Sequence, residues 1–190
     1  MGSRTPLRWR RCFLAAICVN CFELSLPSGI DDRKPGCKRE TRLHSPHTQK
    51  MIMTALGKIT IKTMVSANKQ KVWDYYTRPE HITKWNFADP SWHCPTATNN
   101  MSVGGRYLAR MEARDGSAAF DFDAVYTEIN VGKSFTYVFY GRTATVEFAE
   151  ENGATAVTVT FDPETENAIE LQRQGWQSIL DNFKKYTEAN

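Results

Sequence analysis

The chain has 190 residues, of which 41% are hydrophobic and 24% charged, and its formal net charge is +3. This length suits one ordinary domain, and the composition is typical of a globular protein rather than a disordered one. The longest uninterrupted apolar run, Cys12 to Val19, has eight residues, whereas a membrane-spanning helix needs about 20. The sequence therefore predicts no membrane span.

The first fifty residues differ from the rest in charge and in cysteine content. They carry ten Lys or Arg and four acidic residues, a net charge of +6, whereas residues 51–190 carry 14 and 17, a net charge of −3. Four of the five cysteines also lie in the first fifty residues. We therefore divide the chain into a leader, residues 1–52, and one globular domain, residues 53–190.

Several interpretations of the leader stay open. Arginines precede an apolar stretch, Cys12 to Phe22, of about the length of a signal-peptide core, but no typical cleavage site follows it. The Arg-rich start without acids also fits a mitochondrial-type presequence. Met51 and Met53 stand where the globular pattern begins, so the leader could instead be non-native, or a disordered tail. We expect a cytoplasmic protein if the leader is not native, and an exported or organellar one otherwise.

The domain begins with the pattern of one strand and two short helices. Apolar and polar residues alternate in Lys58–Val65, which is typical of a half-buried strand. Ser66 is a favoured N-cap for a helix that begins at Ala67. Pro79 suits the first turn of a second helix, which we expect to end near Trp85.

The middle of the domain predicts a loop and then a run of antiparallel strands. Asn86–Met101 contains two prolines and two consecutive asparagines, and we expect it to be a long loop. Beyond it, Asp115-Gly116 and Asn152-Gly153 are hairpin signals, and the short spacings between segments indicate antiparallel neighbours. The five predicted strands are 106–112, 118–129, 134–140, 143–149 and 155–161.

A long amphipathic helix is predicted at the end of the chain. Asp162 is a favoured cap and Pro163 a favoured first residue, and apolar residues recur at helical spacing from Thr165 to Thr187. Gln172 and Gly175 lie on or beside this stripe, and a helical glycine costs about 1 kcal/mol relative to alanine, which indicates that a strand or a ligand comes close. The stripe consists of Ile169, Trp176, Ile179, Leu180 and Phe183.

The order of these elements resembles the α+β helix-grip fold of the START-like, Bet v 1-like, SRPBCC superfamily. Two runs resemble the branch named for the activator of the heat-shock-protein ATPase: VWDYYTRPEHITKWN (Val72–Asn86) and VGGRY (Val103–Tyr107). Two more are similar to its third strand and terminal helix: YTEI (Tyr126–Ile129) and ENAIELQRQGWQSILDNFKKY (Glu166–Tyr186). The resemblance covers about residues 57–188 and implies a curved antiparallel sheet wrapped on the long helix.

Fold alone does not decide function, so we expect one function and keep two alternatives. The first is non-catalytic binding of a small apolar or aromatic molecule in a cavity between the sheet and the C-terminal helix. The second is a co-chaperone-type interaction module with a chaperone partner in the stress response, which an exposed charged face of the sheet would favour. The third is a small cyclase or hydrolase that uses a titratable group in the cavity, with Glu112, His81 and His93 as candidates.

Aromatic residues on neighbouring strands are the candidate lining of the cavity. Because side chains alternate across a strand, Phe120, Phe122 and Tyr126 share one face, and three more rings share one face of the next strand. A tyrosine hydroxyl there would give the wall a polar group; the other interpretation is ordinary core packing. The residues expected to contact a ligand are Trp85, Trp92, His93, Phe120, Phe122, Tyr137, Phe139, Trp176 and Leu180.

Other side chains do not form a convincing catalytic, metal or cofactor site. Asp121 and Asp123 alternate with aromatic residues, which places them toward solvent. His81, His93 and Cys94 lack both a metal-ligand spacing and an orienting third group, and the leader cysteines lack paired C-x-x-C geometry. The acidic domain has no basic patch for nucleic acid. We therefore expect no catalytic residue, metal, cofactor or nucleic-acid partner.

Overall fold

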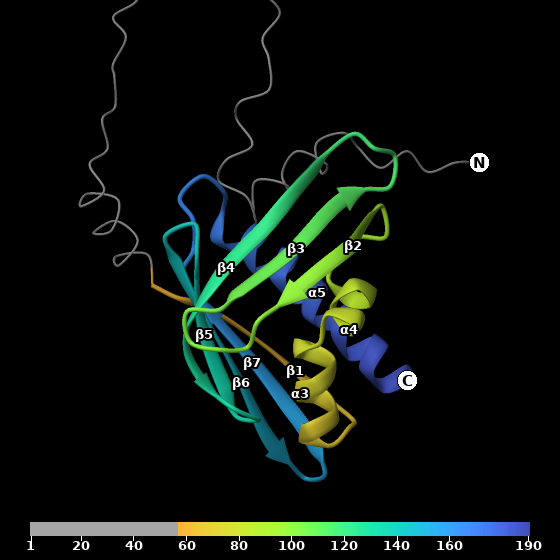
Figure 1. Ribbon diagram of the computed structural model, residues 1–190, viewed down its shortest axis with the longest axis vertical. Coiled ribbons are helices and arrows are strands. Elements are labelled where there is room, and N and C mark those ends of the chain that lie inside the picture. The colour runs from red at the N-terminus through yellow and green to blue at the C-terminus, as the bar shows by residue number, and fades with distance from the viewer. Residues whose placement is uncertain (1–56) are drawn as a thin grey trace, which may run out of the picture.

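The computed structural model describes residues 57–190, which form a curled antiparallel sheet and three helices (Figure 1). The seven strands lie in the order β1-β7-β6-β5-β4-β3-β2. The boundary predicted between leader and domain, at residues 52 and 53, lies outside the described residues. The strands are β1 (Ile59–Val65), β2 (Trp92–Asn99), β3 (Arg106–Ala113), β4 (Ala119–Asn130), β5 (Ser134–Phe139), β6 (Arg142–Glu151) and β7 (Ala154–Phe161), and the helices are α3 (Lys69–Thr77), α4 (Pro79–Trp85) and α5 (Ile169–Ala189).

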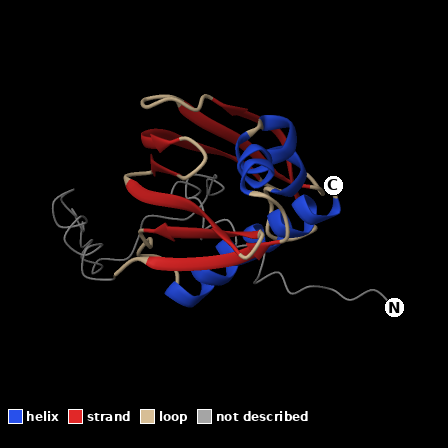
Figure 2. Cartoon of the chain, turned by 90° about the horizontal axis from the view of Figure 1, so that it is seen from below, coloured by secondary structure: helices blue, strands red, loops and turns tan. Residues whose placement is uncertain are grey.

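The helices gather along one side of the curved sheet (Figure 2). This arrangement follows from the burial pattern, because the sheet has one apolar face that must be covered. Along β5 the buried residues alternate with more exposed ones, and α5 buries a stripe at helical spacing. The helix-grip fold predicted from the order of the elements is therefore confirmed.

Among the described helices, none is both long enough and apolar enough to cross a membrane.

Helix α3 begins two residues later than predicted, because Asn68 rather than Ser66 is its N-cap. The side-chain oxygen of Asn68 accepts a hydrogen bond from the backbone N–H of Lys71 at 2.9 Å. The backbone N–H of Ser66 instead donates to the carboxylate of Glu188 at 2.7 Å, which ties the end of β1 to α5. The prediction of Ser66 as the cap was wrong because Asn and Ser are about equally good caps.

The segment expected to be a long loop contains the strand β2, so that prediction was also wrong. Pro95 lies inside this strand and cannot donate a hydrogen bond to a neighbour. It is tolerated because β2 is an edge strand, and because a bulge between His93 and Thr96 interrupts the pairing with β3. The strand ends at Asn99, which brings that amide to the interior.

The meander from β3 to β7 follows the predicted boundaries to within two residues. Both hairpin signals are confirmed as tight turns in the left-handed region. Asn152 and Gly153 have φ of 53° and 80°, and Gly116 has φ of 71°. Asn-Gly adopts positive φ at both residues at little cost, whereas at Asp115-Gly116 the glycine alone is in the left-handed region.

Helix α5 begins at Ile169, so the prediction that Asp162 and Pro163 open it was wrong. Both residues lie in the loop after β7. Asp162 forms an ion pair with Lys58 at 2.5 Å and accepts a hydrogen bond from the backbone N–H of Thr143 at 2.9 Å. The carboxylate therefore fixes the end of the sheet rather than the start of the helix.

Helix α5 also lies along the outer edge of β1. The side chains of Arg173, Gln177 and Lys184 donate hydrogen bonds to three carbonyl oxygens of β1 at 2.9, 3.4 and 2.5 Å. These carbonyls belong to alternate residues, so they share the edge of β1 that no strand within residues 57–190 pairs with. The side chains of α5 thus satisfy hydrogen-bond acceptors along an edge that would otherwise be open to pairing with another chain.

Candidate functional site

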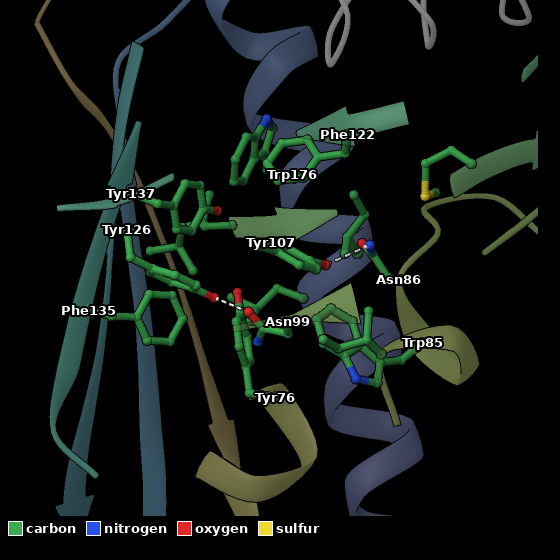
Figure 3. A pocket seen from close by; sticks show the side chains of 16 residues that line it. Tyr76, Trp85, Asn86, Asn99, Tyr107, Phe122, Tyr126, Phe135, Tyr137 and Trp176 are labelled. Carbon is green, nitrogen blue, oxygen red and sulfur yellow. Dashed lines mark hydrogen bonds between the residues drawn. The ribbon is translucent and has the colours of Figure 1, made fainter. Parts of the chain in front are cut away.

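A partly enclosed cavity lies between the inner face of the sheet, the short helices and α5 (Figure 3). Its volume is about 60 Å³, several times the roughly 10–15 Å³ that one water molecule needs. Its surface is mostly apolar. The lining residues are Ile61, Tyr76, Ile82, Trp85, Asn86, Asn99, Tyr107, Met111, Phe122, Tyr126, Phe135, Tyr137, Val159, Trp176, Ile179 and Leu180.

Rings pack against rings to hold the walls of the cavity in place. Trp176 of α5 stacks on Phe161 of β7 with the ring centroids 4.2 Å apart and the planes 16° from parallel. On the sheet, Phe122 meets Tyr137 edge-on, with centroids 6.0 Å apart and planes at 86°. Such offset and edge-to-face contacts add to the stability from burial. These contacts fix the rings of the wall relative to one another.

One hydrogen-bonded chain of polar groups crosses the cavity wall from β4 to α3. The hydroxyl of Tyr126 donates to Oδ1 of Asn99 at 2.9 Å. Nδ2 of Asn99 donates in turn to the carbonyl oxygen of Thr77, the last residue of α3, at 2.7 Å. These two hydrogen bonds satisfy a carbonyl oxygen at the end of α3 and fix Asn99 against the sheet.

A second polar pair, Asn86 and Tyr107, joins the end of α4 to β3. Nδ2 of Asn86 donates to the hydroxyl oxygen of Tyr107 at 3.0 Å, which leaves the phenolic proton of Tyr107 available (Figure 3). Within residues 57–190, the hydroxyls of Tyr76 and Tyr137 form no hydrogen bond to another side chain or to the backbone. Three phenolic donors therefore remain available beside the apolar surface.

Burial keeps these phenols protonated. Desolvation raises the pKa of Tyr76, Tyr107, Tyr126 and Tyr137 above the ordinary value of a tyrosine, because the phenolate would lose its hydration. Neighbouring tyrosines raise the pKa of Tyr137 further, and Arg142 lowers it by less. The hydroxyls are therefore hydrogen-bond donors at neutral pH.

The structure brings five of the nine predicted ligand contacts to the cavity. The other four lie elsewhere. Phe120 and Phe139 are buried in the core behind the lining, and Trp92 packs near Phe120 with centroids 5.9 Å apart. His93 is half-buried beside Glu112, with Nε2 3.8 Å from the carboxylate. The five at the cavity are Trp85, Phe122, Tyr137, Trp176 and Leu180.

The sequence analysis did not single out four polar or amphipathic lining residues: Tyr76, Asn86, Asn99 and Tyr107. The two asparagines lie in the segment interpreted as a loop, where asparagine is common, so their position gave no signal. Tyr107 could have been found, because it lies on the same face of β3 as the buried Met111.

None of the three titratable candidates for catalysis, Glu112, His81 and His93, lines the cavity. Nδ1 of His81 is 2.9 Å from the hydroxyl of Tyr186, and its ring stacks on Tyr75 with centroids 3.9 Å apart. Glu112 accepts a hydrogen bond on the outside of the sheet. Among the sixteen lining residues there is no acidic, basic or histidine side chain.

The remaining polar candidates are also away from the cavity. Asp121 and Asp123 form ion pairs with arginines of β3 on the outer face of the sheet, as their alternation predicted. Cys94 is buried, and desolvation raises the pKa of its thiol to about 11. Within residues 57–190, no three or more His, Cys, Asp and Glu side chains lie close enough to hold a metal ion.

Fold and site together define a class, the helix-grip proteins of the SRPBCC superfamily. Residues 66–188 match the family described as activator of Hsp90 ATPase homolog 1-like protein, so the chain belongs to this family. This confirms the resemblance predicted from the sequence. A search of curated proteins gave no match.

Solved structures support the same assignment. The solution structure of an AHSA1-like protein from Aeromonas hydrophila is 41% identical, with a TM-score of 0.67 over 70% of this chain and 92% of that one. A protein from Cytophaga hutchinsonii is 42% identical, with a TM-score of 0.62 and coverages of 70% and 93%. A crystal structure from Nitrosomonas europaea, at 18% identity, shares the fold with a TM-score of 0.62 and coverages of 71% and 96%.

Proposed function

We propose that the protein binds a small apolar or aromatic molecule in this cavity and does not transform it. The observation that carries the proposal is a largely apolar cavity whose lining includes two phenolic hydroxyls, of Tyr76 and Tyr137, that have no hydrogen-bond partner within residues 57–190. Ligand sites in proteins are typically concave and apolar, with a few convergent polar groups. The non-catalytic part rests on the lining, which offers no carboxylate, histidine or cysteine for proton transfer or nucleophilic attack.

Native mass spectrometry of the freshly purified protein tests whether a small molecule is retained. A second assay titrates flat aromatic compounds and follows tryptophan fluorescence, because Trp85 and Trp176 both line the cavity. A dissociation constant of 1 mM corresponds to a binding free energy of about −4.1 kcal/mol. Binding with a dissociation constant well below 1 mM would support the proposal. Binding by no compound below about 1 mM would contradict it.

A matched pair of variants separates cavity binding from surface adsorption. Leu180→Phe adds bulk to a buried lining residue and should weaken ligand binding, because the space for the ligand is reduced. Leu108→Phe makes the same change on the outer face, where Leu108 is 36% exposed, and should leave binding unchanged. Equal effects of the two substitutions would show that the ligand does not occupy the cavity.

A second function, a co-chaperone-type interaction module, is favoured by one observation. The outer face of β3 and β4 carries an array of ion pairs in which Arg106 pairs with Asp123, and Arg110 with Asp121 and Glu112. An exposed charged face of this kind suits contact with a protein partner more than contact with a small molecule. Charge reversal of Arg110 to Glu should abolish stimulation of a chaperone ATPase if this function is correct, and leave cavity binding intact.

A further inference from the structure

We propose that the cavity selects a neutral ligand that carries a hydrogen-bond-accepting oxygen, such as a carbonyl, on an aromatic or otherwise apolar frame. The inference rests on the proposed function, because it specifies the occupant of the same cavity. Two independent features of the lining carry it: the lack of any charged side chain, and the surplus of phenolic donors.

The lining excludes charge. Its residues are aliphatic, aromatic or amide-bearing, so an anionic ligand would find no cation there and a cationic ligand no carboxylate. The buried guanidinium of Arg142 lies against the ring of Phe139, 4.6 Å from its centroid, and neither residue lines the cavity. Its charge lowers the pKa of Tyr137, but by less than desolvation raises it, so burial outweighs this cation at the wall. Moving an ion from water into such a site without a counter-ion is far more costly than moving a neutral group. Fatty-acid anions and aromatic carboxylates should therefore be poor ligands.

The available polar groups favour an acceptor on the ligand. The hydroxyl of Tyr137 points from β5 into the space between the walls, and Tyr76 and Tyr107 also retain their phenolic protons (Figure 3). The side-chain oxygen of Asn99 already accepts a hydrogen bond from Tyr126. A purely apolar ligand would cover these hydroxyls and leave them without a hydrogen-bond partner. A ligand whose carbonyl oxygen reaches one of them would avoid that cost.

Three naphthalenes of similar size test both features on the full chain by isothermal titration calorimetry at pH 7.5. They are 2-acetylnaphthalene, which has a carbonyl, 2-isopropylnaphthalene, which lacks it, and 2-naphthoate, which is an anion. The ketone should bind about 3- to 10-fold more tightly than the hydrocarbon, the contribution of one hydrogen bond. Naphthoate should bind at least about 100-fold more weakly than the ketone because of its desolvation.

Two substitutions locate the selectivity in named residues. Tyr137→Phe should lower the preference for the ketone over the hydrocarbon, because it removes the donor that points into the cavity. Tyr186→Phe should leave the preference unchanged, because the hydroxyl of Tyr186 contacts His81 away from the cavity. Ile179→Lys adds a cation to a half-buried lining position and should improve naphthoate binding at least about 10-fold, the usual scale of a charge-assisted contact in a partly buried site.

The outcomes distinguish the inference from the function on which it rests. If the three compounds bind with equal affinity, the cavity binds ligands but the inference about charge and acceptor is wrong. Naphthoate as the tightest ligand would also overturn it. If none of the three binds and native mass spectrometry finds no retained molecule, the proposed function fails, and the inference fails with it.

Discussion

Replacing Gln172 with methionine should destabilise the protein by about 2–5 kcal/mol. This side chain is fully buried on α5 and ties the preceding loop to the helix. Its Oε1 accepts a hydrogen bond from the backbone N–H of Glu164 at 2.9 Å, and its Nε2 donates to the carbonyl oxygens of Glu164 and Asn167 at 3.1 and 2.9 Å. Methionine has a similar length and shape, so the substitution removes these bonds while it keeps most of the packing.

The expected magnitude follows from the backbone groups left behind. A buried polar group that loses its partner costs about 1–3 kcal/mol, and the substitution leaves one N–H and two carbonyl oxygens without the amide. The group at Asn167 is only partly buried and can bind water, so we expect less than the full sum. The loss would still be a large share of a typical domain stability of about 5–15 kcal/mol.

Urea unfolding of the wild type, Gln172→Met and Gln174→Met measures this effect against a matched control. Gln174 lies two residues further along α5 and is exposed, and its side chain donates a hydrogen bond to the carboxylate of Glu170 at 3.2 Å. Its substitution should change the free energy of unfolding by less than about 0.5 kcal/mol. A loss below about 1 kcal/mol at Gln172, or equal losses at the two positions, would refute the reasoning.

Three further predictions concern the helix, the domain boundary and acid stability. Gly175 is buried on α5, so Gly175→Ala should lose about 1–3 kcal/mol by overpacking, more than the gain of about 1 kcal/mol in helix propensity; a more stable variant would show open space there. Residues 53–190 alone should unfold within about 2 kcal/mol of the full chain in thermal melts, and a larger loss would mean that the leader packs on the domain. Hydrogen bonds from Ser66 and Lys184 lower the pKa of Glu188 below the ordinary value of a glutamate. Its contribution to stability is therefore present above the unfolded pKa and is lost as the pH falls through the lowered, folded pKa. Glu188→Gln should flatten the fall in melting temperature between about pH 6 and pH 3, and an unchanged slope would show that these hydrogen bonds do not stabilise the fold.

The strands of the meander are predictable because each one shows its burial in its own sequence. Residues alternate between the two faces of β5 and β6, and the turns carry Gly at positions of positive φ. The strand β2 escapes this logic. Its Pro95 and the bulge before Thr96 are features that only an edge strand tolerates, and edge position depends on the whole sheet rather than on local sequence.

The candidate site is harder to predict than the fold for a related reason. Tyr137 and Phe139 lie two residues apart on the same face of β5, and both are buried, yet only Tyr137 lines the cavity. Phe139 instead fills its surroundings, with Trp176 at 5.6 Å and Arg142 over its ring. The difference depends on which side chains from α5 and β6 pack against each ring, which no local pattern records. Hydrophobicity thus predicts burial but not which buried ring faces empty space.

The covered edge of β1 has a consequence for synthesis of the chain. Thr60 contacts Thr160 of β7, 100 residues later, and the side chain of Arg173 that covers the same strand lies 113 residues from it. At a translation rate of about 5–20 residues per second, roughly 5–20 s pass between the emergence of β1 from the ribosome and the emergence of Thr160 and Arg173. During that interval both its edges are open, so the nascent chain passes through a stage that is prone to intermolecular pairing. The β1 edge is sealed only when Lys184, near the end of α5, has emerged.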